Sequence, residues 1–512
     1  MIQVEEYRGH IRNWKALCAE LQIEEGLERP EREREILRKG YAAWGTELPD
    51  HLYGMFAFAI WDEENETLYC ARDQFGTKPF YYYQTEDGGL LYGTMIRQIL
   101  EQDGFVKELN ESMLQIYLSL TYAAGEDTFF KGLKKLMPGH CLTWKQGELT
   151  VMRYFAPSYH PDETKSLEEW ADEIHTTLQA ILPEVKEEGE TAESFLSGGV
   201  DSSYVLAVSD AQVSDSCGYD EERFDESPLA AETARILGRK NNRCRITPEE
   251  YFAAVPYVME NMELPLGDAS AIVFAIACRA TAEHTKLCYS GEGADEFFGG
   301  YNMYRNAERY GDNLKTFYVG NTNIMKEEEK ERILQHYDPA VLPINLVKDI
   351  YEETEGLDPL TRMADIDIRI WLEGDIYLNV DKMSEAAGLE IRMPLTDRRI
   401  FDIACRLPAK YKVNAEQNKV AFRTAAAKVL PEEIAFRKKL GFIVPIRIWM
   451  ADDRYNAGVR EVIFSENAAK FFKPEEIRGI WDAYIGGDSD LWRKVWTIYT
   501  FLVWYQIYFA EK

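Results

Sequence analysis

The chain has 512 residues, a length that allows about two to four domains with cores of their own. Its composition, 46% hydrophobic and 29% charged, is that of a folded protein and excludes a low-complexity chain. A net charge of −30 repels polyanions, so nucleic acid is not an expected partner.

The cysteines and the apolar segments indicate the compartment. Eight cysteines are scattered without a CxxC pair or a Cys/His cluster, which favours a reducing compartment and argues against a zinc site. The N-terminal residues do not form a signal peptide. The longest uncharged apolar run, residues 495–510, is shorter than the roughly 20 residues of a membrane span and predicts a buried terminal helix. We therefore expect a cytoplasmic protein without a membrane partner.

The first third of the chain is patterned as strands. Residues 54–62 are apolar and aromatic on both faces, which predicts a strand buried in a layered core. Further strands are predicted at 68–73, 79–83 and 90–93, and a helix at 33–44. The polar segment 157–161 marks a linker, and we place a domain boundary near residue 160.

The rest of the chain alternates between strands and helices before becoming helical. Helices are predicted at 167–182 and 227–237, and strands near 215–219 and 286–289. This alternation predicts a parallel, doubly wound sheet. Beyond about residue 300 we expect no strand.

A glycine turn that follows the short apolar segment 194–196 carries the strongest chemical signal. Strand, glycine turn and helix start together point backbone N–H groups at a phosphate. The expected nucleotide contacts are Leu196, Ser197, Gly198, Gly199, Asp201, Ser202 and Ser203. Asp201 is also a candidate Mg²⁺ ligand. The turn contains no lysine, which excludes the Walker A pattern.

A second acidic motif spans residues 289–301. It places Glu292, Asp295 and Glu296 directly after a predicted strand. Carboxylates at the C-terminal end of a strand, opposite a phosphate loop, suit Mg²⁺ coordination and base catalysis. We expect Glu292 to have a raised pKa because other acids surround it.

The two motifs resemble those of the asparagine synthetase family. SGGxDSS is similar to the pyrophosphate loop of ATP pyrophosphatases, and 290–301 is similar to the synthetase string S-G-E-G-S-D-E-x-F-G-G-Y. Residues 54–62 and 71–83 resemble central strands of the family's N-terminal-nucleophile glutaminase domain. The resemblance implies an α/β protein with two domains. Residues 1–160 would be an Ntn-hydrolase-like layered α/β remnant, and residues 161–512 a doubly wound HUP-like ATP-pyrophosphatase domain with a helical C-terminal part.

The resemblance also implies roles for individual residues. Catalytic roles fall to Glu292, Tyr301 and Lys439, the last within the 437–442 motif. Asp201, Glu226 and Asp295 would bind Mg²⁺. The alternative for the segment around Glu226 is a helix cap formed by Asp225 or Ser227. Cys217 and Gly218 would contact adenine, and Ser290 and Gly291 the nucleotide. Lys382 and Thr396 depart from the family pattern, which questions an aspartate pocket.

The N-terminal region departs further from a working glutaminase. Residue 2 is Ile2 instead of the nucleophilic cysteine, and the first cysteine is Cys18. Gln3-Val4 replace the expected Asn-Gly, and Glu33 replaces the aspartate that would hold the glutamine amine. We expect a truncated, degenerate domain without glutamine hydrolysis. A sequence that lacks its start is the alternative.

The predicted function is that of an ATP- and Mg²⁺-dependent amide ligase. A carboxylate such as aspartate would be adenylated with release of pyrophosphate and then joined to an amine. The amine would be free ammonia, ammonia from a partner protein, or the substrate's own amine, as in β-lactam synthetases and in lasso-peptide macrocyclases with a peptide substrate. A tRNA-modifying ATP pyrophosphatase shares the loop but requires a basic face. A homodimer is the expected assembly.

Overall fold

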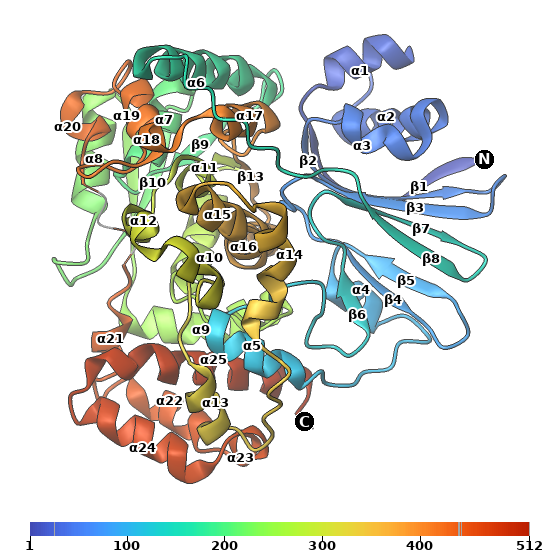
Figure 1. Ribbon diagram of the computed structural model, residues 1–512. Coiled ribbons are helices and arrows are strands. Elements are labelled where there is room, and N and C mark those ends of the chain that lie inside the picture. Colours follow the sequence, from blue (N-terminus) through green and yellow to red (C-terminus); the bar gives the residue numbers. More distant parts are fainter. Residues whose placement is uncertain (25, 439–440, 442, 511–512) are drawn as a thin grey trace.

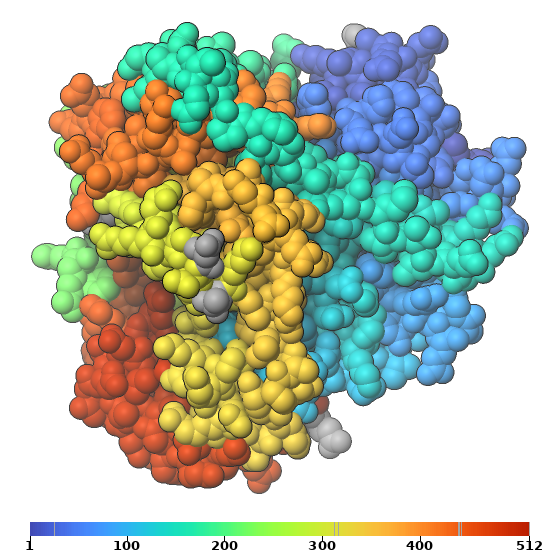
Figure 2. Space-filling view, viewed as in Figure 1, coloured from blue at the N-terminus to red at the C-terminus, as the bar shows by residue number. Residues whose placement is uncertain are grey.

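The structure, a computed structural model, describes residues 1–24, 26–438, 441 and 443–510. Two antiparallel sheets belong to the first third of the chain, and a parallel sheet wrapped by helices belongs to the rest (Figure 1). In the space-filling view the N-terminal third lies along one side of the molecule, beside the yellow and orange segments (Figure 2). The predicted α/β class with two kinds of sheet is confirmed.

Five strands form the larger antiparallel sheet, in the order β1-β2-β3-β7-β8. They are β1 (Ile2–Ile11), β2 (Gly54–Asp62), β3 (Thr67–Arg72), β7 (His140–Lys145) and β8 (Glu148–Arg153). The smaller sheet has the order β5-β4-β6, with β4 (Tyr81–Gln84), β5 (Leu90–Gly93) and β6 (Leu133–Lys135). Helices α1 (Trp14–Leu21), α2 (Arg29–Trp44) and α3 (Leu48–His51) complete this region.

The position of strand β2 between two packed layers explains why its sequence is apolar on both faces. Phe56, Phe58 and Ile60 pack in one cluster with residues of α1 and α2. Ala57 and Ala59 point to the other face and pack with Phe80 and Tyr82 between the two sheets. Successive side chains of a strand alternate between faces, so a strand in the middle of a layered stack must be apolar throughout.

The parallel sheet has the order β11-β10-β9-β12-β13. Its strands are β9 (Glu193–Phe195), β10 (Val213–Gly218), β11 (Lys240–Arg245), β12 (Leu287–Tyr289) and β13 (Glu390–Arg392). The connecting helices are α6 (Leu167–Ile181), α7 (Val200–Val208), α8 (Ser227–Ile236), α9 (Pro248–Met262) and α10 (Ser270–Ala282). The doubly wound arrangement is confirmed, and the chain order reverses between β9 and β12.

The expectation of no strand beyond residue 300 is wrong. Strand β13 pairs with β12 at the edge of the parallel sheet, through Glu390, Ile391 and Arg392. It is three residues long, and charged residues flank its one apolar side chain. Such a segment carries no alternating pattern, so only its tertiary pairing makes it a strand.

Helices make up most of the remaining structure. They are α4 (Ile96–Leu100), α5 (Ser112–Leu120), α11 (Ala294–Phe298), α12 (Ala307–Tyr310), α13 (Glu327–Ile333), α14 (Lys348–Glu353), α15 (Pro359–Ile366), α16 (Leu378–Ala387), α17 (Arg398–Arg406), α18 (Ala409–Lys412), α19 (Val420–Ala426), α20 (Glu432–Ala435), α21 (Ile446–Trp449), α22 (Asn456–Ile463), α23 (Glu466–Phe471), α24 (Pro474–Ile485) and α25 (Trp492–Tyr508). A π-helical segment, Asp367–Tyr377, joins α15 to α16. The predicted buried terminal helix is α25. Within the described residues, every helix is too short or too polar to span a membrane.

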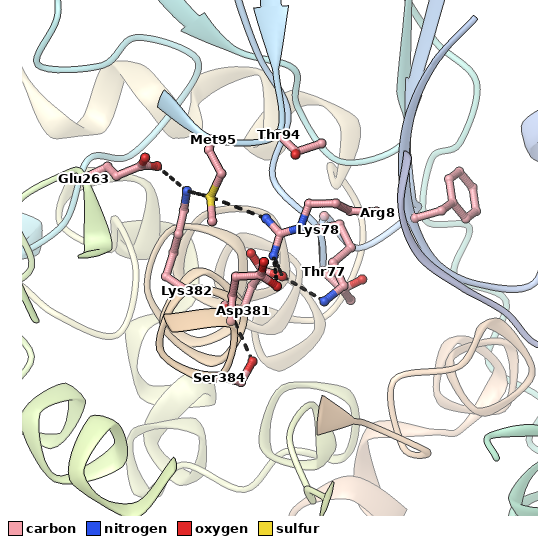
Figure 3. A network of polar contacts seen from close by, with 12 residues as sticks. Arg8, Thr77, Lys78, Thr94, Met95, Glu263, Asp381, Lys382 and Ser384 are labelled. Atoms are coloured by element: carbon pink, nitrogen blue, oxygen red, sulfur yellow. Dashed lines mark hydrogen bonds and ion pairs between the residues drawn. The ribbon is translucent and has the colours of Figure 1, made fainter. Parts of the chain in front are cut away.

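A network of buried charges joins the N-terminal sheets to the helices that follow (Figure 3). Asp381 on α16 accepts hydrogen bonds from Arg8 of β1 at 3.1 Å and from Lys78 at 2.8 Å. The adjacent Lys382 pairs with the buried carboxylate of Glu263 and lies 3.0 Å from the sulfur of Met95. Lys382, which we noted as a departure from the family pattern, is therefore part of this junction.

A second buried cluster crosses the same junction. Glu373 accepts hydrogen bonds from Arg72 at 3.0 Å and from Lys135 at 2.9 Å, and all three side chains are about 1% exposed. Burial opposes ionisation of Glu373, but the two cations outweigh it and hold its pKa below the usual value. The carboxylate is therefore charged at neutral pH, and each N-terminal cation depends on it for neutralisation.

We predict that Glu373→Gln lowers the free energy of unfolding by about 3–5 kcal/mol, because it leaves buried cations without a counter-charge. Chemical denaturation at pH 7 would measure the loss. Glu353 provides a matched control, since it also pairs with two arginines but is 41% exposed. Glu353→Gln should cost about 1 kcal/mol or less. Equal losses in the two variants would contradict the importance of the buried cluster.

Candidate active site

The two sequence motifs meet at the carboxyl edge of the parallel sheet. The phosphate loop, residues 196–199, follows β9, and the acidic loop, residues 290–293, follows β12. These two strands are neighbours on either side of the point where the strand order reverses. In open α/β sheets that reversal opens a crevice, which is where ligands bind.

Glycines and serines shape the phosphate loop. Gly198 has φ +82°, and a Cβ on it would approach the backbone nitrogen of Ala230 to 3.0 Å. The hydroxyl oxygens of Ser197 and Ser202 lie 3.1 Å apart, and Ser202 Oγ also accepts a hydrogen bond from the Ser197 amide. Helix α7 begins directly after Gly199. The loop is thus held by its own side chains in front of a helix N-terminus, the arrangement that favours an anion.

The acidic loop packs directly on the phosphate loop. A Cβ on Gly291 would come within 3.0 Å of the Ser202 amide nitrogen and 3.2 Å of the Cβ of Asp201. A side chain at this position would therefore push the two loops apart by a few tenths of an ångström, and glycine lets them lie in direct contact.

Thr396 and Tyr377 hold the acidic loop from behind. The Thr396 hydroxyl donates to the Glu292 carbonyl at 3.1 Å, and Tyr377 lies 2.7 Å from the same threonine oxygen. Ser290 Oγ donates to Glu292 Oε1 at 3.1 Å and so orients the carboxylate. Thr396, which we noted only as a departure from the family pattern, thus has a structural role beside Glu292.

Lys419 neutralises the two predicted Mg²⁺ ligands and was missed by the sequence reasoning. Its Nζ lies 2.6 Å from Asp201 Oδ1 and 2.8 Å from Asp295 Oδ1, and its side chain is 2% exposed. It precedes α19 with φ +57°. Nothing local in Asn418-Lys419-Val420 marks this lysine. A cation could have been expected on general grounds only, because two carboxylates that meet in a half-buried site require a positive charge between them.

Two arginines connect the segment around the end of α20 to the phosphate loop. Arg423 Nη1 donates to the carbonyls of Ala435 at 2.7 Å and Arg437 at 2.9 Å. Arg437 in turn donates to the Gly198 carbonyl at 2.8 Å. The segment that we predicted to supply Lys439 therefore reaches the phosphate loop through Arg437. Lys439 itself lies outside the described residues.

A cavity of about 300 Å³ lies between the two loops. The predicted site residues on its walls are Leu196, Ser197, Gly198, Gly199, Asp201, Ser202, Cys217, Glu226, Ser290, Gly291, Glu292 and Asp295. Ser203, Gly218 and Tyr301 are not on its walls: Ser203 is buried within α7, and Gly218 packs against Asp225 and Ser227. Additional wall residues include Arg437 of the 437–442 motif and, among residues that the sequence did not single out, Phe274, Ile376, Asn379, Val380, Lys419 and Arg423.

The choice between Glu226 and its neighbours can be made from their contacts. Asp225 Oδ1 accepts hydrogen bonds from the amide and hydroxyl of Ser227, and its Oδ2 pairs with Arg243 at 2.6 Å. Asp225 therefore orders the start of α8, while Glu226 faces the cavity. This geometry favours Glu226 as the third acid near a metal, as the sequence suggested.

Tyr301, for which we predicted a catalytic role, is hydrogen-bonded to a carboxylate of α11. Its hydroxyl donates to Glu296, which is 2% exposed. Burial, followed by the nearby charge of Asp295, raises the pKa of Glu296 to about 8. Tyr301 and the buried Glu296 therefore form a pair beside the acidic loop.

The residues present fit a Mg²⁺ ion. One oxygen each of Asp201 and Asp295 already converges on a single positively charged group, and Glu226 lines the same cavity. Carboxylate oxygens are the ligands that Mg²⁺ prefers, together with water and substrate phosphates.

The positions predicted to replace glutaminase residues are occupied by structural contacts. Glu33 is 1% exposed, and its Oε1 accepts a hydrogen bond from the Ile11 amide at 2.8 Å and lies 3.4 Å from His10 Nδ1. Cys18 is 2% exposed on α1, within the core cluster between α1, α2 and the larger sheet.

Comparisons with known proteins cover almost the whole chain. The sequence model of the asparagine synthase family matches residues 187–506, and that of the glutamine amidotransferase domain matches 4–155. The latter spans nearly the whole N-terminal region, so the expectation of a truncated domain is not supported.

Asparagine synthetase [glutamine-hydrolyzing] 1 of Bacillus subtilis is 31% identical over 99% of this chain and 86% of its own length. A putative asparagine synthetase of Mycobacterium tuberculosis is 29% identical over 98% and 84%. Amidase chyE of Penicillium rubens is 29% identical over 53% and 43%.

We predict that Lys419→Met strengthens the binding of a divalent cation to the nucleotide-free protein at least about tenfold. The variant removes the ammonium that competes for Asp201 and Asp295, whereas the carboxylates remain. Mn²⁺ titration followed by electron paramagnetic resonance would measure it. Lys428→Met, which removes a lysine paired with the exposed carboxylate of Asp172, is the control. Unchanged or weaker Mn²⁺ binding in Lys419→Met would contradict the role given to Lys419.

Proposed function

The chain belongs to the asparagine synthase family, and we propose that it is an ATP-dependent amide ligase acting in the cytoplasm on aspartate or a similar carboxylate. A carboxylate oxygen attacks the α-phosphorus of ATP, the bond to the bridging oxygen breaks, and pyrophosphate leaves. An amine then attacks the acyl carbon of the adenylate, loses a proton, and expels AMP. The convergence of Asp201 and Asp295 in front of the phosphate loop is the observation that supports this proposal most directly.

The positive groups around the loop define where pyrophosphate would bind. The backbone N–H groups at the start of α7, with Ser197 and Ser202, face the cavity that Lys419 closes on its other side. A bound Mg²⁺, held by Asp201, Asp295 and Glu226, would neutralise phosphate charge. The ammonium of Lys419 would then be free to contact phosphate oxygens. We assign Lys439 the same kind of role on the basis of the family motif.

Glu292 is suited to act on the amine. Its carboxylate is oriented by Ser290 and its backbone by Thr396, so it is held independently of the two proposed metal ligands. We propose that it accepts the proton that the attacking amine loses, or positions that amine. Tyr301, hydrogen-bonded to Glu296, supports the loop from the protein interior.

The source of the amine distinguishes the remaining alternatives. Ammonia, free or delivered by a partner, would make the chain a synthetase in the narrow sense, whereas an amine on the substrate would make it an intramolecular amide former. A tRNA substrate is disfavoured because a net charge of −30 repels the phosphate backbone. We place the boundary between the two functional regions near residue 160.

A pyrophosphate-release assay with ATP, Mg²⁺, ammonium and a panel of carboxylic acids that includes aspartate tests the proposal. We predict release that depends on one class of acid, with AMP and an amide as the other products. Asp295→Asn should reduce it by at least about 10²-fold, because the variant loses charge at the proposed metal site. Release of ADP and phosphate, or full activity of Asp295→Asn, would overturn the proposal.

We predict that Glu292→Gln slows amide formation by roughly 10²- to 10⁴-fold, the usual contribution of general acid–base catalysis. Pyrophosphate release should fall less, since the adenylate still forms and is slowly hydrolysed. Both products would be measured on the same samples. A parallel loss of the two products would assign Glu292 to adenylation instead.

We also propose that this 512-residue chain does not take nitrogen from glutamine. Cys18, the first cysteine of the sequence, is enclosed in the core, and Glu33 is engaged with Ile11 and His10. With ¹⁵N-amide glutamine we predict no label in the product, while ¹⁵N-ammonium in the same assay labels it. Label from glutamine with the purified chain would show that the N-terminal region is an active glutaminase.

A further inference from the structure

A cluster of three titratable side chains lies at the parallel sheet, and none of them has been given a role above. One of them, Asp215, also lines the active-site cavity. Glu193 begins β9, Asp215 belongs to the neighbouring β10, and His284 lies between α10 and β12. His284 Nδ1 is 3.0 Å from Glu193 Oε2, and His284 Nε2 is 3.7 Å from Asp215 Oδ1. One potential ligand atom from each residue lies within 4.8 Å of the other two.

The cluster does not satisfy its own polar atoms. Asp215 is 8% exposed, and its Oδ2 has no hydrogen-bond partner among the described residues. Glu193 Oε2 likewise lacks a hydrogen bond, although the imidazole nitrogen is only 3.0 Å away. Two adjacent carboxylates in a half-buried site need a proton or a cation between them. Burial and the nearby Glu193 raise the pKa of Asp215 to about 8, because both disfavour a second negative charge at this position.

We propose that Glu193, Asp215 and His284 bind a divalent transition-metal ion, for which Zn²⁺ is the probe. Zn²⁺ takes imidazole nitrogen and carboxylate oxygen at about 2.0–2.2 Å, so two of its ligands lie at most about 4.4 Å apart. The separations of 3.0 and 3.7 Å involve different imidazole nitrogens, of which an ion would use one. One atom from each residue lies within 4.8 Å of the other two, so the widest pair would have to close by no more than about 0.4 Å to reach that limit. The exposed side of His284 leaves room for water as a further ligand.

The surroundings of the cluster already orient one ligand. Asn242 Nδ2 donates to Asp215 Oδ1 at 3.1 Å and so fixes the orientation of the carboxylate, while Oδ2 has no hydrogen-bond partner among the described residues. Partners of this kind commonly fix metal ligands. The three residues lie on separate segments, which is why the absence of a Cys/His motif in the sequence says nothing about them.

The site would brace the base of the phosphate loop. The carbonyl of Asp215 accepts a hydrogen bond from the Leu196 amide at 2.8 Å, and Leu196 is the first residue of that loop. An ion that links β9, β10 and the segment before β12 therefore stabilises the strands from which both active-site loops emerge. Its expected role is structural, and it would bind without nucleotide.

The test is Zn²⁺ titration of chelator-treated protein by calorimetry, in the Asp295→Asn background so that the proposed Mg²⁺ ligands contribute less. We expect one site that His284→Ala weakens at least about tenfold, and a rise in Tm on Zn²⁺ addition that the same variant loses. His336→Ala is the matched control, because His336 is another exposed imidazole paired with a carboxylate, Glu111, at 3.1 Å. It should leave Zn²⁺ affinity unchanged.

Glu193→Gln provides a second variant in case His284→Ala unfolds, and circular dichroism would report folding. We expect it to weaken Zn²⁺ binding by a similar factor. Co²⁺ substitution should give a visible absorption band that both variants lose. Absence of Zn²⁺ binding, or an affinity equal in His284→Ala and His336→Ala, would overturn the proposal and leave a shared proton as the counter-charge.

Discussion

The active-site region depends on a single ammonium group that holds two carboxylates together. Asp201 and Asp295 belong to different loops and would repel each other in a site that is largely removed from water. Lys419 lies within 2.8 Å of both and is almost fully buried. Because it comes from α19, far along the chain, the helical C-terminal part is required to assemble the phosphate loop and the acidic loop into one site.

That assembly also depends on the absence of side chains at particular positions. Gly291 lets one loop lie against the backbone of the other, and Gly198 lets the phosphate loop turn beside α8. The topology of the sheet brings the loops near each other, since both follow neighbouring strands at the reversal point. The two glycines then allow the backbones of the two loops to come into contact. The sheet topology thus brings the loops together, the glycines set the distance between them, and the ammonium of Lys419 joins their carboxylates.

The features that could be predicted from the sequence are those determined by residues adjacent in the chain. A strand buried on both faces, the helix after the glycine turn and the position of Glu226 all follow from adjacent residues. Features that depend on distant segments could not be predicted: Lys419 has no local motif, and Tyr301 pairs with Glu296 because of how its loop folds back. Strand β13 exists only through its pairing with β12. Thr396 was recognised as unusual, but its hydrogen bond to Glu292 required the structure.

The buried charges between the N-terminal sheets and the rest of the chain have a consequence for protein engineering. Asp381 pairs with Arg8 and Lys78, and Glu373 pairs with Arg72 and Lys135. Asp397 likewise pairs with Arg12 at 2.7 Å. Deletion of the N-terminal region would leave these three carboxylates without their cations on a newly exposed surface. Exchange for the N-terminal region of a relative would place them opposite side chains that need not be cations. The N-terminal region therefore stabilises the rest of the chain whatever its own chemistry, and a chimera must carry these cations and carboxylates together.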